Sequence, residues 1–474
     1  MLKDLISDTV KYGIGKVLLK FFSILIVPIL AKNFPPDIFG EINIITVFIS
    51  LFLGITVLGL DSAVGYFYYH GENNLKRDYL GTSFLIRIIT SLIFFIIFYI
   101  FSKELSSSNF LLKNNKKYFL IVLGASVLPF DNCMSFFIDL SRFLMKPIFY
   151  NIVNLSKVFI YYILIIIFLF HNLTIEKVLI AILISSIIPS IFLLIYYKHM
   201  LNFKLNLYCL KRLLKYGIPL VPASIMFFFI NSSNRFVLNI FTTLEEVGIY
   251  SLMNSISSIF LLITSSIIMA WPPYAMIIAK NANAKEIFAK ITTTLIILLI
   301  PLAFYFWSIS DFTILLFSTP IYLKGEKILI LLILQHIMNL LYYCISIGLT
   351  LKEKTIYISI GYTIAAIISI SISFPLCKYY GIFGAALSSF IGYFISILYI
   401  GFKSQKYYKI LYNLKFLLSY IIIVLFVIFI SLYIHNTNIY INFIYRFAIG
   451  LIFTLIPFIF KMLKFSEIKL LFIK

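Results

Sequence analysis

Residues 178–197 read VLIAILISSIIPSIFLLIYY, a run of 20 residues without a charged side chain. A helix rises about 1.5 Å per residue, so this run is long enough to cross the roughly 30 Å of hydrocarbon in a bilayer. Similar runs, separated by charged residues, proline or glycine, recur along the chain and predict membrane-spanning helices. The 14 expected spans begin near Gly13, Glu41, Gly81, Tyr118, Ile152, Lys177, Gly217, Val247, Thr292, Lys327, Ile356, Ile382, Lys415 and Ile441.

The composition agrees with this number of spans. Of the 474 residues, 62% are hydrophobic and 12% are charged, and this charged fraction is about half that of an ordinary globular protein. Fourteen helices of about 20 residues would use roughly 280 residues, which leaves only connections and tails. A soluble protein is therefore excluded, as is a separate soluble catalytic domain, and the function must lie within or between the membrane helices.

The distribution of charge predicts the orientation of the spans. The chain carries 39 Lys and Arg against 18 Asp and Glu, a net charge of +21. With the amino terminus in the cytoplasm, 25 of the basic residues fall on the cytoplasmic side and 11 on the outer side, in agreement with the positive-inside rule. We therefore expect both termini in the cytoplasm. No nucleic-acid partner is expected, because no basic run is long enough to indicate one.

No cofactor, metal site or catalytic motif is expected. The sequence contains no Walker loop and no nucleophile elbow, so we expect a protein that is not an enzyme and that does not hydrolyse ATP through such a loop. The four cysteines show neither C-x-x-C nor His-paired metal spacing. They are Cys133, Cys209, Cys344 and Cys377.

An internal repeat relates the two halves of the chain. Lys11-Tyr-Gly-Ile14 opens the first span and Lys215-Tyr-Gly-Ile218 opens the seventh, an offset of about 204 residues. The pairs Phe39-Gly40 and Val247-Gly248 each precede the following span. Because six spans separate the copies, the halves should share one topology and be related by an axis along the membrane normal. The expected parts are residues 1–200 for spans 1–6, 201–402 for spans 7–12 and 403–474 for two additional spans.

Three groups of landmarks resemble the bacterial polysaccharide transporter family, the flippases of lipid-linked O-antigen and capsule repeat units within the multidrug/oligosaccharidyl-lipid/polysaccharide exporter superfamily. The first comprises Tyr12-Gly-Ile-Gly-Lys16, Pro28, Phe39-Gly40 and Leu58-Gly-Leu-Asp61-Ser62-Ala63. The second comprises Tyr216-Gly-Ile-Pro219, Asn234-Arg235-Phe236, Glu246-Val-Gly248 and Ala270-Trp-Pro-Pro273. The third is Tyr380-Gly-Ile-Phe-Gly-Ala-Ala386. The sequence departs from the family pattern at Asn234, where an acidic residue commonly precedes the arginine.

The resemblance implies an all-α integral membrane protein with about 14 transmembrane helices. Two parallel-repeat six-helix lobes would surround a central cavity that opens alternately to the two faces, and two C-terminal helices would follow. The implied partners are the lipid bilayer and an undecaprenyl-pyrophosphate-linked glycan, together with a polysaccharide polymerase and chain-length machinery. The implied location is the bacterial plasma (inner) membrane.

Basic residues inside the spans are the first candidates for contact with a phosphorylated headgroup. A lysine near the centre of a membrane helix costs roughly 2.5 to 3.5 kcal/mol on the insertion scale, so its side chain should face water or protein. Arginine can bind phosphate through two hydrogen bonds, and lysine acts as a point charge. The predicted headgroup-binding residues are Lys16, Lys20, Arg87, Lys157 and Arg235.

Acidic and amide side chains are expected to complete the polar surface of the cavity. Asp131 and Asp139 share one face of the fourth span, where neutralisation of Arg87 or Lys20 is a better interpretation than direct cation transport. The other polar or coupling candidates are Asn154, Asn231 and Asn254. For Gln335, His336 and Asn339 of the tenth span, and for Asn254, we expect hydrogen bonds between helices.

These features favour outward flipping of lipid-linked oligosaccharide repeat units by alternating access. Two alternatives stay open, a flippase for the peptidoglycan lipid precursor and a cation-coupled multidrug antiporter on the same scaffold. An integral-membrane glycosyltransferase would need a sizeable extramembrane loop, whereas no predicted outer loop exceeds about 20 residues.

Overall fold

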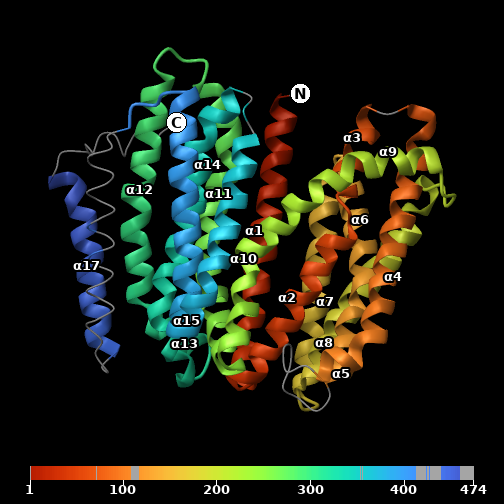
Figure 1. Ribbon diagram of the computed structural model, residues 1–474, viewed down its shortest axis with the longest axis horizontal. Coiled ribbons are helices and arrows are strands. Elements are labelled where there is room, and N and C mark those ends of the chain that lie inside the picture. Colours follow the sequence, from red (N-terminus) through yellow and green to blue (C-terminus); the bar gives the residue numbers. More distant parts are fainter. Residues whose placement is uncertain are drawn as a thin grey trace. The chain divides into compact units, whose positions relative to one another are not determined.

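The computed structural model describes residues 2–70, 72–107, 117–352, 354, 356–412, 423, 426 and 439–459. Within these ranges the regular structure is helical and contains no strand (Figure 1). Nine of the described helical segments are long and apolar enough to cross a membrane, and Ile439–Leu455 is a shorter apolar helix. The chain is therefore a multi-pass helical membrane protein, as the sequence predicted.

The chain divides into two compact units, residues 1–248 and 249–474. This division rests on compactness and not on the repeat, so the predicted boundaries near residues 200 and 402 stay predictions. The helices of the first unit are α1 (Leu2–Asn33), α2 (Pro36–Thr56), α3 (Leu60–His70), η1 (Asn73–Leu75), α4 (Lys76–Ser107), α5 (Lys117–Ala125), α6 (Val127–Phe143), α7 (Pro147–Leu169), α8 (Ile175–Tyr197), η2 (Lys198–Met200), α9 (Leu207–Gly217), η3 (Ile218–Leu220) and α10 (Val221–Phe241).

Helix α11 (Leu244–Ile278) begins in the first unit and continues into the second. The other helices of the second unit are α12 (Ala284–Ser308), α13 (Ser310–Phe317), η4 (Pro320–Gly325), α14 (Glu326–Leu351), α15 (Ile356–Tyr407) and α17 (Ile439–Ile459). In this unit α14 packs between α12 and α15, and α17 packs on α12 (Figure 1).

Local sequence signals explain where several helices begin. Proline occupies the first position of α2 and of α7, where a missing backbone N–H leaves no hydrogen bond unmade. Thr174 caps α8 by accepting a hydrogen bond from the Lys177 backbone N–H at 3.4 Å. Asn206 caps α9 in the same manner, accepting from the backbone N–H of Tyr208 at 3.0 Å.

The observed helices correspond to the predicted spans, with one span outside the described residues. Helix α15 is two helices joined at Gly381, which has the positive φ of 51° that glycine tolerates, so it supplies the eleventh and twelfth spans. The fourth span corresponds to α5 and α6 together, which are separated by a turn at Ser126. The seventh span corresponds to α10. The predicted span near Lys415 lies almost entirely outside the described residues.

The repeat landmarks Gly40 and Gly248 pack directly against each other's helices in the first unit. A Cβ atom on Gly40 would lie 2.2 Å from the Leu244 carbonyl oxygen, and one on Gly248 would lie 1.8 Å from the Pro36 carbonyl oxygen. The two contacts are reciprocal, since Pro36 and Gly40 correspond to Leu244 and Gly248 at one constant offset. Reciprocal contact is typical of elements related by a two-fold axis, and here it requires a residue without a side chain.

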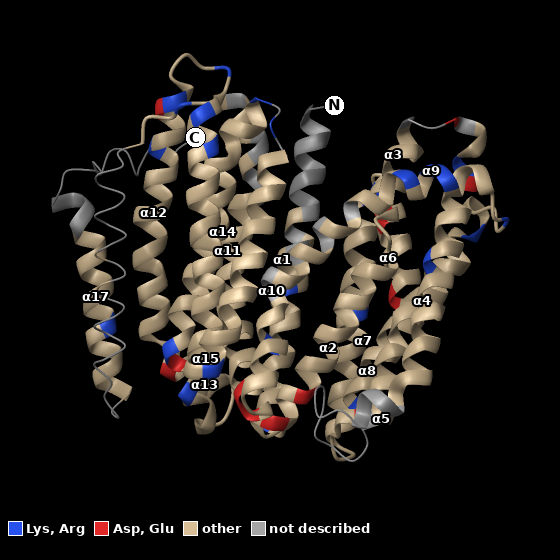
Figure 2. Ribbon diagram, in the orientation of Figure 1, with Lys and Arg blue, Asp and Glu red and all other residues tan. Residues whose placement is uncertain are grey.

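Helix α9 joins the sixth and seventh spans and is amphipathic. Cys209, Leu213 and Gly217 recur every four residues and are buried, whereas Lys211 and Lys215 are exposed. Figure 2 shows basic residues along α9, in contrast to the mostly uncharged middle parts of the spans. Such a helix suits the boundary between membrane and water.

Candidate functional site

Helices α4 and α6 bring a buried arginine against a carboxylate inside the first unit. The Arg87 side chain is only 1% exposed, and its Nη2 lies 3.4 Å from Asp139 Oδ2. Its guanidinium carbon lies 5.6 Å from the centroid of the Phe136 ring. The Arg87 Nε and Nη1 atoms are buried and have no hydrogen-bond partner among the described residues. Unpaired buried donors are costly, so an oxygen-rich anion would be stabilised beside them.

A second arginine shares the same carboxylate. Arg142 Nη2 lies 3.4 Å from Asp139 Oδ1, and the Arg142 side chain is 52% exposed. The group formed by Arg87, Asp139 and Arg142 thus contains two cations and one anion when all three are ionised. The negative charge of Asp61 also acts on Asp139, so the two arginines and the two acids together are close to neutral when all four are ionised.

Lysine and aspartate form a further ion pair between α6 and α7. Lys157 Nζ lies 2.5 Å from Asp131 Oδ1, and the two side chains are 30% and 13% exposed. Asp131 precedes Asp139 by eight residues on one face of α6, which corresponds to about 12 Å along the helix. The two ion pairs therefore lie along the same side of α6.

Contacts between α1 and α7 place Lys20 at the level of Lys157. The glycine at position 15 leaves room for Asn151, whose Oδ1 atom would lie 1.8 Å from a Cβ atom there. The rings of Phe22 and Phe159 are 4.9 Å apart. These two contacts are in register along parallel helices, so Lys20 and Lys157 lie at similar depths.

Lys20 is half-buried and makes no ion pair among the described side chains. The positive charge of Arg235 on α10 also acts on Lys20. An anion bound beside Lys20 would be attracted by this lysine.

The structure assigns the two acids more specifically than the sequence did. Asp139 neutralises Arg87, as expected. Asp131 pairs with Lys157 and not with Lys20, because α6 packs on α7. The sequence predicted the polar face of each helix but not which helices contact each other.

Two further predicted site residues, Asn154 and Asn254, form no part of these ion pairs among the described contacts. The side-chain amide nitrogen of Asn154 donates a 2.8 Å hydrogen bond to the Tyr150 backbone carbonyl in the same helix, α7. The side-chain oxygen of Asn154 can still accept hydrogen bonds from other groups. Asn254 is half-buried in α11. The side chains of Lys16 and Asn231 lie outside the described part of the structure.

Polar residues of the second unit connect helices, as predicted. His336 Nε2 and Ser257 Oγ are 3.3 Å apart between α14 and α11. Gln335 accepts a 2.9 Å hydrogen bond from Ser389, and Asn339 accepts one of 3.1 Å from Tyr362. The predicted role of all three residues in hydrogen bonds between helices is confirmed.

A second buried charge cluster was missed by sequence analysis. Arg446 of α17 is 1% exposed and pairs with Asp311 and Glu326. An arginine inside an apolar span was the signal that could have indicated it.

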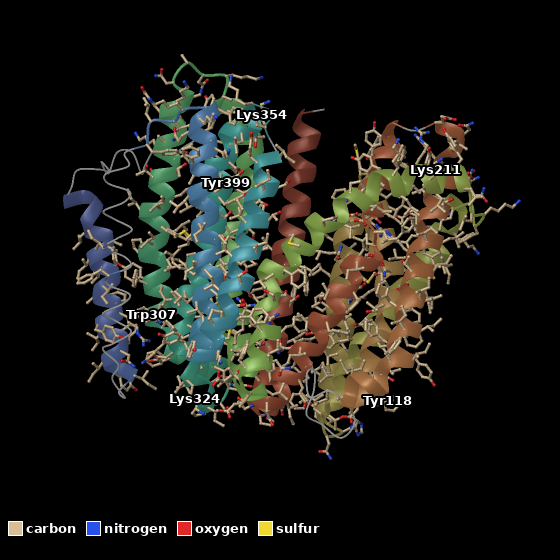
Figure 3. The ribbon with its side chains drawn as sticks, viewed as in Figure 1. Tyr118, Lys211, Trp307, Lys324, Lys354 and Tyr399 are labelled. Carbon is tan, nitrogen blue, oxygen red and sulfur yellow. The ribbon has the colours of Figure 1, made fainter. Side chains whose placement is uncertain are left out.

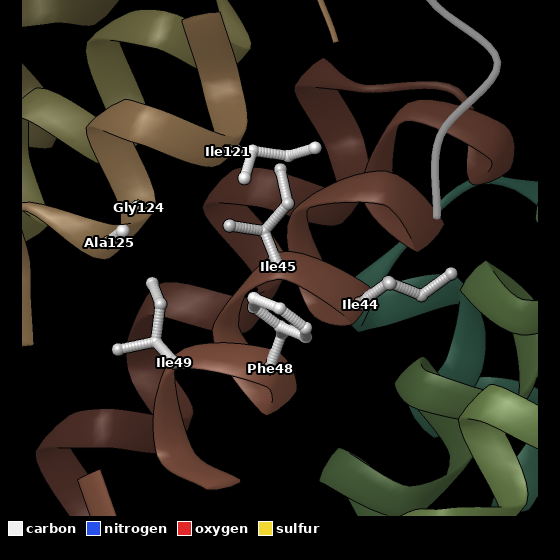
Figure 4. A pocket seen from close by; sticks show the side chains of 7 residues that line it. All are labelled: Ile44, Ile45, Phe48, Ile49, Ile121, Gly124 and Ala125. Atoms are coloured by element: carbon white, nitrogen blue, oxygen red, sulfur yellow. The ribbon is translucent and has the colours of Figure 1, made fainter. Parts of the chain in front are cut away.

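An apolar pocket lies between α2 and α5 of the first unit (Figure 4). No charged side chain lines it, so it offers no partner to a phosphorylated headgroup. Its lining residues are Ile44, Ile45, Phe48, Ile49, Ile121, Gly124 and Ala125.

Many membrane helices, together with cations buried between them, are typical of a membrane transporter. The model of the polysaccharide biosynthesis protein family matches residues 5–279, more than half of the chain, and the chain belongs to this family. No curated protein matches the chain.

Solved structures of two transporter groups share the fold. The lipid II flippase MurJ in an inward closed conformation matches with a TM-score of 0.73 at 16% identity, covering 95% of this chain and 98% of that chain. An inward-facing multidrug resistance MATE transporter of the MOP superfamily matches with a TM-score of 0.61 at 14% identity, covering 82% and 94%. The Vibrio cholerae MATE transporter VcmN in its bent form matches with a TM-score of 0.56 at 14% identity, covering 85% and 96%. At these identities the matches establish the fold alone.

Proposed function

We propose that this protein is a flippase, not an enzyme, and moves undecaprenyl-pyrophosphate-linked oligosaccharide repeat units from the inner to the outer leaflet of the plasma membrane. It would serve O-antigen or capsule biosynthesis, with both termini in the cytoplasm. Its product would pass to a polysaccharide polymerase and chain-length machinery. Membership of the polysaccharide biosynthesis family and the transporter fold support this proposal.

The observation that carries the proposal is the state of Arg87. A guanidinium that is 1% exposed retains two nitrogens without a hydrogen-bond partner among the described residues. A pyrophosphate supplies several strong acceptor oxygens, and arginine can bind such oxygens through two hydrogen bonds. The pyrophosphate would therefore bind against Arg87, with Lys157 and Lys20 as further cationic contacts.

The acidic partners explain how the cations are held without a ligand. Asp139 and Asp131 keep Arg87 and Lys157 paired inside the membrane, where an unpaired charge is costly. An entering pyrophosphate would compete with these carboxylates for the same cations. For alternating access, this exchange would have to differ between the inward-open and outward-open states, so that the ligand binds one state more tightly.

The membrane potential can supply the direction of transport. An inside-negative potential favours outward movement of an uncompensated anion by about 2.3 kcal/mol per charge per 100 mV. A cation-coupled antiporter would instead need carboxylates available to the coupling ion. Within the described part of the first unit, Asp131 and Asp139 already pair with basic side chains, which favours the anionic substrate.

Flipping can be measured in proteoliposomes that contain an undecaprenyl-pyrophosphate-linked fluorescent sugar, with an impermeant reagent detecting the outer leaflet. We expect the double variant Lys20→Ala/Arg87→Ala to lose flipping while keeping the elution profile and helical content of the folded protein. Lys280→Ala is the matched control, since Lys280 is exposed in the connection between α11 and α12. Unchanged flipping in the double variant would refute the proposed headgroup site.

A further inference from the structure

A buried cluster in the second unit joins the last described helix to three other segments. Arg446 of α17 contacts Asp311 of α13 and Glu326 at the start of α14, with Nη1 to Oδ1 and Nη2 to Oε1 distances of 3.2 and 2.7 Å. All three side chains are at most 5% exposed. Trp307 of α12 completes the cluster, since the Arg446 guanidinium carbon lies 4.5 Å from its ring centroid. Figure 3 labels Trp307 and Lys324 toward the same end of this unit.

The charges of this cluster do not balance when both acids are ionised. Among the described ion pairs of this cluster, two carboxylates face one guanidinium, which gives about one excess negative charge. The effective cost of burying an unpaired ion is several kcal/mol, and a buried acid commonly avoids it by binding a proton. Binding of a single proton would make the cluster neutral.

Contacts with one guanidinium bring the two acids close together. Arg446 Nη1 lies 3.2 Å from Asp311 Oδ1, and Arg446 Nη2 lies 2.7 Å from Glu326 Oε1. Two carboxylates held this close repel each other when both are ionised, whereas a proton on one of them removes the repulsion and allows that group to donate a hydrogen bond to the other. The geometry and the charge balance therefore point to the same protonation state.

The donors around each acid indicate which one holds the proton. Asp311 accepts hydrogen bonds from Arg446 at 3.2 Å, from Asn442 at 3.3 Å and from Ser310 at 3.4 Å. Hydrogen bonds from three donors favour the ionised form of Asp311. Arg446 Nη2 donates to one oxygen of Glu326, and the other oxygen can hold a proton that is donated to Asp311.

The surrounding titratable groups leave this assignment in place. Tyr445 of α17 accepts a 3.2 Å hydrogen bond from Arg446 Nε and is neutral at ordinary pH. Tyr322 is buried in η4, Lys324 of η4 is exposed, and Lys327 of α14 is half-buried. Arg446 is the cation in direct contact with both acids.

We propose that Asp311 and Glu326 form a proton-binding carboxyl pair, in which Glu326 carries the exchangeable proton and Arg446 pairs with ionised Asp311. Its ligand is a proton from the aqueous phase. Because Arg446 belongs to α17, loss of the proton would place an excess negative charge at the contact between α17 and α13–α14. The attachment of α17 would then depend on pH. This site is separate from the cations of the first unit and does not rest on the proposed transport function.

Infrared difference spectroscopy of the purified full-length protein tests the proposal, because a protonated carboxyl group has a C=O band distinct from that of a carboxylate. We expect Glu326→Gln to remove one protonated-carboxyl band that wild-type protein shows at neutral pH. Asp311→Asn should remove the same band, because Glu326 would then ionise to pair with Arg446. Asp37→Asn is the control and should leave the band unchanged, since Asp37 is exposed.

A band that persists at full intensity in both Glu326→Gln and Asp311→Asn would overturn the proposal. If either variant fails to fold, a pH titration of wild-type protein decides between the outcomes. The proposal expects one such band to disappear with rising pH together with a fall in melting temperature, and a melting temperature without that pH dependence would contradict it. The amide introduced by Glu326→Gln should instead donate to Asp311 at every pH and remove the pH dependence of melting.

Discussion

Arg87 and Asp139 form an ion pair between α4 and α6 that leaves two Arg87 nitrogens without a partner among the described residues. The 3.4 Å distance between Nη2 and Oδ2 is long for a charge-assisted hydrogen bond, and Arg142 shares the same carboxylate. The pair therefore offsets the charge of the arginine inside the membrane but leaves part of its hydrogen-bonding capacity unused. Such an arrangement suits reversible binding of an anion.

Substitution of Arg87 should separate the effects of charge and of hydrogen-bond geometry. We expect Arg87→Gln to reduce flipping by about 10-fold to 100-fold, because hydrogen bonds to charged groups contribute about 1.5 to 3 kcal/mol. Arg87→Lys keeps the charge but loses the planar set of donors, so its flipping rate should lie between those of Arg87→Gln and wild type. Initial flipping rates in proteoliposomes measure the order. Equal rates for Arg87→Lys and Arg87→Gln would argue against a role for the charge.

Removal of Asp139 should destabilise the protein but increase its response to anions. Asp139→Asn leaves Arg87 as an uncompensated buried cation, a change that typically costs about 3 to 5 kcal/mol. The double variant Arg87→Gln/Asp139→Asn should recover much of this loss. Thermal unfolding in detergent, with and without inorganic pyrophosphate, measures both effects. A double variant less stable than Asp139→Asn would show that the two residues are not coupled.

The reciprocal contact of Gly40 and Gly248 should not tolerate a side chain. Gly40→Ala would place Cβ 2.2 Å from the Leu244 carbonyl oxygen, and overpacking of this kind typically costs about 1 to 3 kcal/mol. Gly54→Ala in the same helix is the matched control, since nothing lies within 4 Å of a Cβ atom there. The control should be neutral or up to about 1 kcal/mol more stable. Similar melting temperatures for the two variants would be inconsistent with this close packing.

The Cys209 thiol of α9 should resist alkylation at neutral pH. Burial raises the pKa of Cys209 to about 11, and the negative charge of Asp78 acts in the same direction. The thiol therefore stays protonated as pH rises from 7 toward 11, whereas the reactive thiolate forms only near the upper end of that range. Maleimide labelling followed by mass spectrometry should detect modification of Cys209 after unfolding but not in folded protein at neutral pH. Rapid labelling of folded protein would indicate that α9 does not bury this residue.

The helices were predictable because a bilayer imposes a strong rule on sequence. Apolar runs of about 20 residues can satisfy their backbone only as helices, and breaks such as Gly381 and Pro147 mark their ends. The cations of the candidate site were predictable for a related reason, since basic residues are rare in apolar spans. The need to neutralise a buried charge predicted that an acid of the fourth span would pair with Arg87 or Lys20, but it did not specify the pair of Arg87 with Asp139.

The other pairings depend on which helical faces meet, and a single sequence does not specify this. Lys157 could have paired with any acid at the same depth, and only the packing of α6 on α7 selects Asp131. Arg446 was missed because its carboxylate partners lie more than 100 positions earlier, in a short helix and at a helix end. The contact of Gly40 with Leu244 and Gly248 likewise arises from tertiary packing between segments about 200 positions apart in the sequence.

The central claim is that the cations buried in the first unit bind a pyrophosphate carried on a lipid. Native mass spectrometry of the full-length protein with undecaprenyl pyrophosphate and with uncharged undecaprenol tests it most directly. We predict that wild-type protein binds the pyrophosphate lipid at least about 10-fold more tightly than undecaprenol, and that Lys20→Ala/Arg87→Ala abolishes this preference while Lys280→Ala retains it. Equal binding of the two lipids by wild-type protein, or an unchanged preference in the double variant, would contradict the account.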